Sequence, residues 1–157
     1  IANNDPAACY PAALLSLSGK IITNKRTIES SKFFVGMFET ALDDNEIITF
    51  IELPKNTTSF YKKFSNPASG YAIVGIFLTK FSSKIQIAVT GAGQDGVFRA
   101  KNFEEILNQN FSSAALSEID VSDEELLNDL HASSDYRAHL IKVLIGQIVN
   151  HLNSIEI

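Results

Sequence analysis

The spacing of apolar residues changes near residue 100, and this change constrains the fold more than any other feature of the sequence. Before it, apolar residues alternate with polar ones or form short runs, as in β-strands; after it, they recur with the period of an amphipathic helix. Strand patterns followed by helical patterns, without regular β–α–β alternation, predict an α+β fold.

Several short strands are expected in the first part. Proposed strands lie at residues 20–28 (two strands joined by a polar turn), 46–53, 59–64, 71–80 and 84–90. The continuous apolar run 71–80 is typical of a strand covered on both faces. The link at 81–83 is short enough for an antiparallel hairpin. Between the strands, Ser30–Asp44 shows no clean period, and the polar segment 54–59 is the best internal boundary.

Helices are expected at both ends of the chain. Residues 11–17 predict a short helix, and the capping-box spacing of Asn102 with Glu105 and of Ser122 with Glu125 predicts two helix starts. The strongest prediction is a last helix that begins at Ser134 or Asp135. Its apolar stripe contains Tyr136, Leu140, Ile141, Leu144, Ile145, Ile148 and Leu152, with Arg137, Lys142, Gln147 and His151 off the stripe.

Composition excludes several classes of protein. The 157 residues include 13 Lys and Arg against 18 Asp and Glu, a formal net charge of -5, which argues against a nucleic-acid binder. No apolar stretch approaches the roughly 20 residues of a membrane span. The single cysteine, Cys9, excludes an internal disulfide and a cysteine-ligated metal site made by this chain alone, and it fits the reducing cytoplasm.

No motif predicts catalysis or metal binding by these residues. Gly91–Gly96 matches the dinucleotide-binding glycine pattern, but no helix is predicted at its second glycine, so we interpret it as a glycine-rich turn between two strands. His131, His139 and His151 lack the spacing of a zinc site. Cys9 has no cationic neighbour in the sequence that would activate it. We therefore expect no catalytic residue and no metal ligand.

Three longer segments carry a family resemblance. Residues 1–15, 61–74 and 129–140 resemble, in order and spacing, segments of the FAD-binding medium subunit of aerobic carbon monoxide dehydrogenase and its relatives among the molybdenum hydroxylases. The resemblance implies that residues 1–54 are the latter part of the FAD-binding domain. Residues 57–157 are then the flavoprotein C-terminal domain, a small antiparallel sheet packed with C-terminal helices.

The same resemblance implies cofactor-binding roles for Asn3, Asp5, Cys9, Ile48, Lys63 and Tyr71. Asn3 and Asp5 would follow the ribityl and pyrophosphate part of FAD. Ile48 would supply an apolar wall near the isoalloxazine ring, and Tyr71 would sit near the ring face and gate access to it. Lys63 would approach the polar edge of the ring, where positive charge favours the anionic reduced flavin. Cys9 stands where the family usually has Asp, and a thiol is a weaker hydrogen-bond acceptor than a carboxylate.

In the family that the chain resembles, electrons pass from a molybdenum cofactor through two [2Fe–2S] clusters on partner subunits to FAD and then to an external acceptor. The implied partners are an iron–sulfur small subunit and a molybdenum large subunit. The family's phosphate-binding loop would precede Ile1, so we expect a C-terminal fragment that binds FAD weakly or not at all and is inactive alone. An exposed apolar face, with Phe33, Phe34, Phe38 and Phe50 as candidates, would favour self-association. A non-catalytic docking module for the two partner subunits is the alternative.

Overall fold

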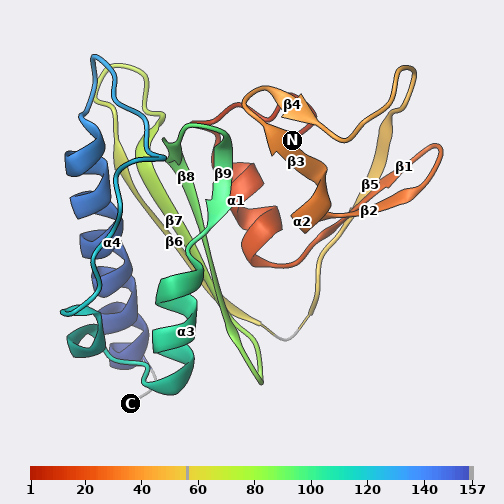
Figure 1. Cartoon of the computed structure of the whole chain (residues 1–157). Helices are drawn as coiled ribbons and strands as arrows, with labels where there is room; N and C mark the ends of the chain where they lie inside the picture. The colour runs from red at the N-terminus through yellow and green to blue at the C-terminus, as the bar shows by residue number, and fades with distance from the viewer. Residues whose placement is uncertain (56, 156–157) are drawn as a thin grey trace.

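Two β-sheets with a helix between them form most of the structure, a computed structural model that describes residues 1–55 and 57–155 (Figure 1). The elements are α1 (Cys9–Ser16), β1 (Lys20–Thr23), β2 (Thr27–Glu29), α2 (Ser30–Phe33), β3 (Phe34–Gly36), β4 (Glu39–Thr40), β5 (Ile48–Glu52), β6 (Thr58–Ser65), β7 (Ala72–Lys80), β8 (Ile85–Gly93), β9 (Gly96–Arg99), α3 (Lys101–Gln109), the 3-10 helix η1 (Ser113–Leu116) and α4 (Ser134–Ile155). The predicted α+β class is confirmed. Asn56 within the expected boundary 54–59, and residues 156–157 at the expected end of the second domain, lie outside the described residues.

The smaller sheet has the strand order β2-β1-β5, and all its pairs are antiparallel. Ile21 in the central strand is fully buried and lies opposite Ile28 and Ile51. The hairpin predicted at 20–28 and the strand predicted at 46–53 are therefore confirmed. A separate two-stranded hairpin, β3–β4, follows α2 in the segment that showed no clean period, because three short elements share it.

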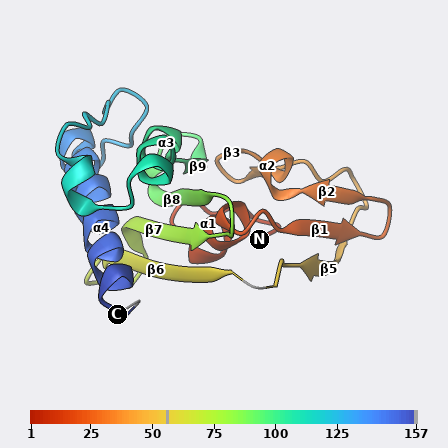
Figure 2. The same cartoon turned by 90° about the horizontal axis from the view of Figure 1, so that it is seen from below.

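The larger sheet is an antiparallel meander with the order β6-β7-β8-β9. The predicted hairpin at 81–83 is confirmed, closed by the Phe81 N–H donating to the Lys84 carbonyl at 2.8 Å. Helices α3 and α4 cover one face of this sheet and α1 covers the other, so β7 and β8 are buried on both faces (Figures 1 and 2). Helix α1 contributes Ala12 and Leu15 to this packing and Leu14 to the smaller sheet.

Neither predicted capping box forms, although a helix does begin near Asn102 as expected. Helix α3 begins at Lys101 after Ala100, so Asn102 lies inside the helix and does not cap it. Ser122 and Glu125 start no helix: the Ser122 hydroxyl accepts from the Glu124 N–H at 3.4 Å in a turn. The Glu125 carbonyl accepts from the Gln94 N–H at 3.0 Å, so this turn is bound to the β8–β9 turn rather than continuing as a helix.

The two terminal helices follow the predictions more closely. Helix α1 was expected at 11–17 and spans Cys9–Ser16, with Pro11 in its first turn. Helix α4 begins at Ser134 as predicted, and its apolar stripe is buried except at Tyr136, which is 41% exposed. Arg137, which was placed off the apolar stripe, is nevertheless buried.

The predicted exposed aromatic face is only partly correct. Phe33 is fully buried in the core of the smaller sheet, so its assignment to the surface is wrong. Its ring lies nearly perpendicular to that of Phe34, with 5.2 Å between centroids. Phe34 is half-buried, whereas Phe38 and Phe50 are 57% and 70% exposed. Among the described residues, no helix is long and apolar enough to cross a membrane.

Candidate functional site

The first eight residues are held along the end of β8 and the β3–β4 hairpin. The Gly91 N–H donates to the Pro6 carbonyl at 2.7 Å, and the Thr90 hydroxyl lies within 2.9 Å of the same oxygen. The buried Asn4 amide donates to the Gly36 carbonyl at 2.7 Å. Asp5 turns the chain by accepting from the Ala7 N–H at 2.9 Å. These bonds fix where α1 begins and leave Asn3 exposed beside them.

Cys9, Tyr61 and Lys63 meet where the first turn of α1 lies against β6. The Tyr61 hydroxyl donates to the Cys9 sulfur at 3.0 Å. The Lys63 ammonium lies 3.7 Å from the same sulfur and donates to the Gly70 carbonyl at 2.8 Å. Tyr61 and Lys63 share one face of β6 because they are two residues apart, whereas Lys62 points to the other face and is exposed. The fold thus supplies a cation beside Cys9 that its sequence neighbours lack.

Tyr61 reaches Cys9 because the strand next to β6 has no side chain in its way. A Cβ at Gly75 would lie 2.6 Å from the Tyr61 hydroxyl oxygen and 2.9 Å from Thr90 Cγ2. Burial, followed by the hydrogen bond to Cys9, raises the pKa of Tyr61 above its usual range. The phenol therefore stays protonated and acts as a donor at neutral pH. Sequence analysis missed Tyr61, whose only signal was its place two residues before Lys63.

Tyr71 lies at the mouth of a cavity of about 230 Å³ beside this cluster. Its side chain is 54% exposed, and its neighbour Gly70 holds Lys63. Pro6, Gly91, His131 and Arg137 also line the cavity. The first segment of the chain, the β6–β7 loop and the start of α4 therefore converge at one edge of the larger sheet.

Arg137 forms the base of this region. Its guanidinium donates to the carbonyls of Ile73 and Gly91 at 2.6 Å each, and to both carboxylate oxygens of Asp129 at 2.8 Å. Partial burial opposes ionisation of Asp129, but the His131 and Ala132 N–H groups and the guanidinium together lower its pKa. Arg137 thus joins α4 to the start of β7 and the end of β8. Its position off the apolar stripe gave no sign of this role.

The six predicted cofactor residues are not all neighbours. Cys9 and Lys63 are in contact, and Lys63 binds the residue before Tyr71. Asp5 lies in the same first segment, next to Pro6 at the cavity. Ile48 is half-buried against the core of the smaller sheet and begins β5. That strand lies on the side of α1 away from α4 (Figure 1). No described contact joins Ile48 or Asn3 to Cys9 or Lys63.

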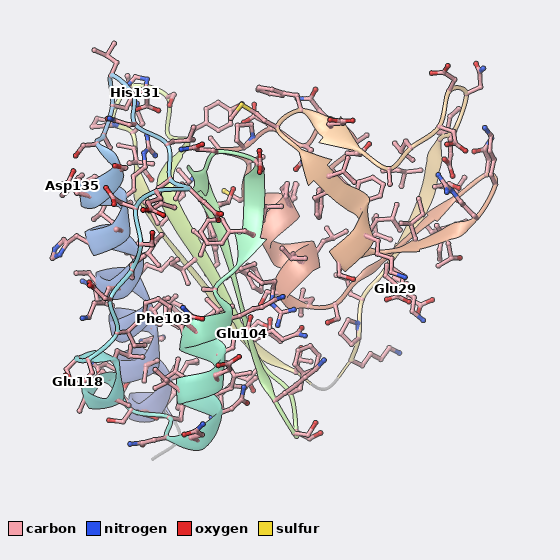
Figure 3. All side chains as sticks on the ribbon, in the orientation of Figure 1. Glu29, Phe103, Glu104, Glu118, His131 and Asp135 are labelled. Atoms are coloured by element: carbon pink, nitrogen blue, oxygen red, sulfur yellow. The ribbon has the colours of Figure 1, made fainter. Side chains whose placement is uncertain are left out.

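The remaining motifs behave as structural features. Gly91–Gly96 ends β8 and turns into β9, which confirms the interpretation as a turn between strands. His131 lies just before α4, with its Nδ1 3.2 Å from the Asn66 amide nitrogen, and Asp135 lies in the first turn of that helix (Figure 3). Within residues 1–55 and 57–155, no three His, Cys, Asp or Glu side chains are grouped so that they could hold a metal ion.

No family model matches the chain, but it is similar to several proteins that are each described as a medium subunit or medium chain. The chain is 31% identical to the nicotine 6-hydroxylase medium subunit of Paenarthrobacter nicotinovorans over 95% of its length, and 30% identical to the glyceraldehyde dehydrogenase medium chain of Sulfolobus acidocaldarius over 92%. It is 22% identical to the carbon monoxide dehydrogenase medium chain of Hydrogenophaga pseudoflava over 96%. The chain spans 57%, 56% and 58% of these relatives, respectively.

Solved structures show the same fold. Quinoline 2-oxidoreductase from Pseudomonas putida 86 matches 96% of this chain with a TM-score of 0.78 at 18% identity, over 57% of its own chain. Carbon monoxide dehydrogenase from Oligotropha carboxidovorans matches 93% with a TM-score of 0.78 at 19% identity, over 56% of its own chain.

Proposed function

We propose that the chain forms part of an FAD-binding electron-transfer subunit of the molybdenum hydroxylase family. Its relatives support this, because they are the medium subunits or chains of nicotine 6-hydroxylase, glyceraldehyde dehydrogenase and carbon monoxide dehydrogenase. In this proposal, residues 1–54 belong to the FAD-binding domain and residues 57–157 to the C-terminal domain. The partners would be an iron–sulfur small subunit and a molybdenum large subunit, in the cytoplasm that the single cysteine suggests.

One observation carries the proposal: the Lys63 ammonium is held by the carbonyl of Gly70, the residue that precedes the exposed Tyr71. An ammonium has three N–H groups, and the described acceptors of Lys63 are the Cys9 sulfur and the Gly70 carbonyl. One N–H therefore remains for a ligand. The polar edge of a flavin ring presents oxygen and nitrogen acceptors next to a flat apolar surface. A cation with a spare donor, held by the residue next to an exposed aromatic side chain, fits that edge.

Each residue then has a definite task. Lys63 donates to the polar edge of the ring, and its charge favours the reduced state. Tyr71 covers the ring face, and Ile48 forms an apolar wall. Asn3, Asp5 and Cys9 line the ribityl and pyrophosphate part. When bound, FAD would supply the electron acceptance and release, while the protein positions it and tunes its electronics.

The experiment compares two adjacent lysines in the complete subunit, purified with its partners. Lys63→Met should release FAD or change its visible absorption spectrum, because the donor at the ring edge is lost. Lys62→Met is the matched control, since Lys62 is exposed on the opposite face of the same strand, and it should behave like the parent. The proposal fails if the purified complex contains no flavin, or if the two variants bind FAD equally well with equal spectra.

A docking module remains the second candidate because the β3–β4 hairpin carries exposed apolar side chains. Val35, Met37 and Phe38 are 53%, 39% and 57% exposed. Phe38 also holds a left-handed backbone conformation with φ of 57°, which is unfavourable for a bulky residue. This reading predicts a colourless complex that loses its partner subunits when Phe38 is replaced by Ser. A flavin-containing complex that assembles normally with Phe38→Ser would exclude it.

A further inference from the structure

We propose that Tyr61 and Cys9 are positioning residues that hold the Lys63 ammonium in place without neutralising its charge. This inference rests on the proposed function of Lys63 at the polar edge of the flavin. It concerns the side chains that contact the Lys63 ammonium and each other, and it adds Tyr61, which sequence analysis did not identify.

The geometry forms a chain of contacts from the sheet to the ammonium. A lysine side chain is long and flexible, so its ammonium is placed only where acceptors hold it. The Gly70 carbonyl holds it at 2.8 Å, and the Cys9 sulfur is the second acceptor at 3.7 Å. The sulfur is oriented in turn by the Tyr61 hydroxyl at 3.0 Å. Loss of that hydroxyl would free the thiol to rotate and leave Lys63 with one firm acceptor.

Tyr61 has little freedom to move away from this position. Its ring packs on Phe77 with 5.9 Å between centroids, and its hydroxyl occupies the space that a Cβ at Gly75 would fill. The ring is half-buried, so the hydroxyl is held by packing as well as by its hydrogen bond. The Tyr61 hydroxyl therefore holds the Cys9 sulfur at a defined position.

Whether the side chain at position 9 is charged or neutral determines how much of the positive charge of Lys63 acts on the flavin. A carboxylate at position 9 would form an ion pair with Lys63 and offset its field at the ring. A thiol accepts a hydrogen bond only weakly and leaves most of the ammonium charge uncompensated. Cys9 therefore keeps Lys63 in place while its positive charge continues to favour the reduced flavin.

The test measures the two-electron midpoint potential of the flavin in the complete subunit with its partners. Tyr61→Phe removes the hydroxyl alone and should reduce the preference for the reduced flavin about three- to tenfold, a drop of about 15–30 mV. Cys9→Asp should reduce that preference at least about tenfold, a drop of about 30 mV or more, because it adds a counter-charge. Cys9→Ser provides a neutral acceptor, so its potential should stay above that of Cys9→Asp. Tyr10→Phe is the matched control for Tyr61→Phe, since Tyr10 is next to Cys9 but 72% exposed, and should cause no shift.

Lys63→Met separates the inference from the proposed function. If Lys63→Met releases FAD or lowers its potential but Tyr61→Phe leaves the potential unchanged, the positioning role is refuted and the function of Lys63 stands. If Lys63→Met leaves the potential unchanged, the proposed function itself fails. The Cys9→Asp and Cys9→Ser pair tests the inference without Tyr61→Phe, because both residues suit the first turn of a helix. Equal potentials in that pair would overturn the argument about charge.

Discussion

Replacing Arg137 with Met removes a buried guanidinium while keeping a side chain of similar length in α4. In the parent, Arg137 donates to the carbonyls of Ile73 and Gly91 and to both oxygens of Asp129. The Arg137 side chain is 3% exposed and the Asp129 side chain 40% exposed. In the variant, the buried carbonyls of Ile73 and Gly91 therefore lose their Arg137 donor, whereas the Asp129 carboxylate can be hydrated.

The cost follows from these contacts. Each interior carbonyl that loses its donor destabilises the fold by about 1 kcal/mol. The half-exposed ion pair adds about 1 kcal/mol, as expected for a pair that water can partly replace. Together these losses lower the free energy of unfolding by about 3 kcal/mol. At about 2–4 °C per kcal/mol for a chain of this size, the Tm should fall by about 6–12 °C.

Urea unfolding followed by circular dichroism at neutral pH measures this difference. Gln147→Met is the control, because Gln147 is exposed on the same helix and should change stability by less than about 0.5 kcal/mol. Arg137→Lys keeps the charge but cannot reach all four acceptors, so it should fall between the parent and Arg137→Met. The reasoning is refuted if Arg137→Met unfolds within about 1 kcal/mol of Gln147→Met.

Three further substitutions test other parts of the fold. Hydrogen bonds from Arg26, Asp43 and Thr23 lower the pKa of Glu46 from 4.5 to about 2, so its stabilisation is complete above pH 4.5 and is lost as the pH falls toward 2. Acid titration of stability should therefore show the gap between the parent and Glu46→Gln closing across that range; a constant gap would contradict the argument. Gly91→Ala should cost at least about 2 kcal/mol in urea unfolding, because φ is +82° and the new Cβ would lie 2.5 Å from the Ala72 carbonyl; a neutral result would exclude the clash. Phe33→Ala should cost about 3–5 kcal/mol by the same measurement if the ring is a core residue, whereas an exposed ring predicts almost no change.

The strands were predictable because their signals are local. The apolar run at 71–80 required burial on both faces, and β7 occupies Ala72–Lys80 with α1 on one side and α4 on the other. At 84–90 the alternation of Ile85, Ile87 and Val89 places them in the main core, while Ala88 between them packs with α1. Successive side chains along a strand point to opposite faces because of the backbone geometry. The face to which each of these side chains points could therefore be predicted without knowing the rest of the fold.

The capping predictions failed because contacts to other strands, made at or next to the predicted capping residues, are not visible in the local pattern. The capping box at Asn102 depends on local pairing, but the adjacent Glu104 accepts from Arg99 and from the Ile87 N–H at 2.7 Å. Those contacts fix the first turn of α3 one residue before Asn102. A capping pattern describes what a segment can do alone, and here contacts to β8 and β9 decided the outcome.

The candidate site was predictable residue by residue only through the family resemblance, since its parts come from separated segments. Cys9 and Lys63 are 54 positions apart, and Arg137 binds the Ile73 carbonyl across 64. Nothing local to position 61 distinguishes Tyr61 from any tyrosine on a half-buried strand; its role depends on the missing side chain at Gly75 in the paired strand. The predicted list therefore contains Cys9 and the groups proposed to face the cofactor, but it omits Tyr61 and Arg137. A group that touches a ligand can be identified by its own chemistry, whereas a group that positions another can be identified only once the fold has placed both.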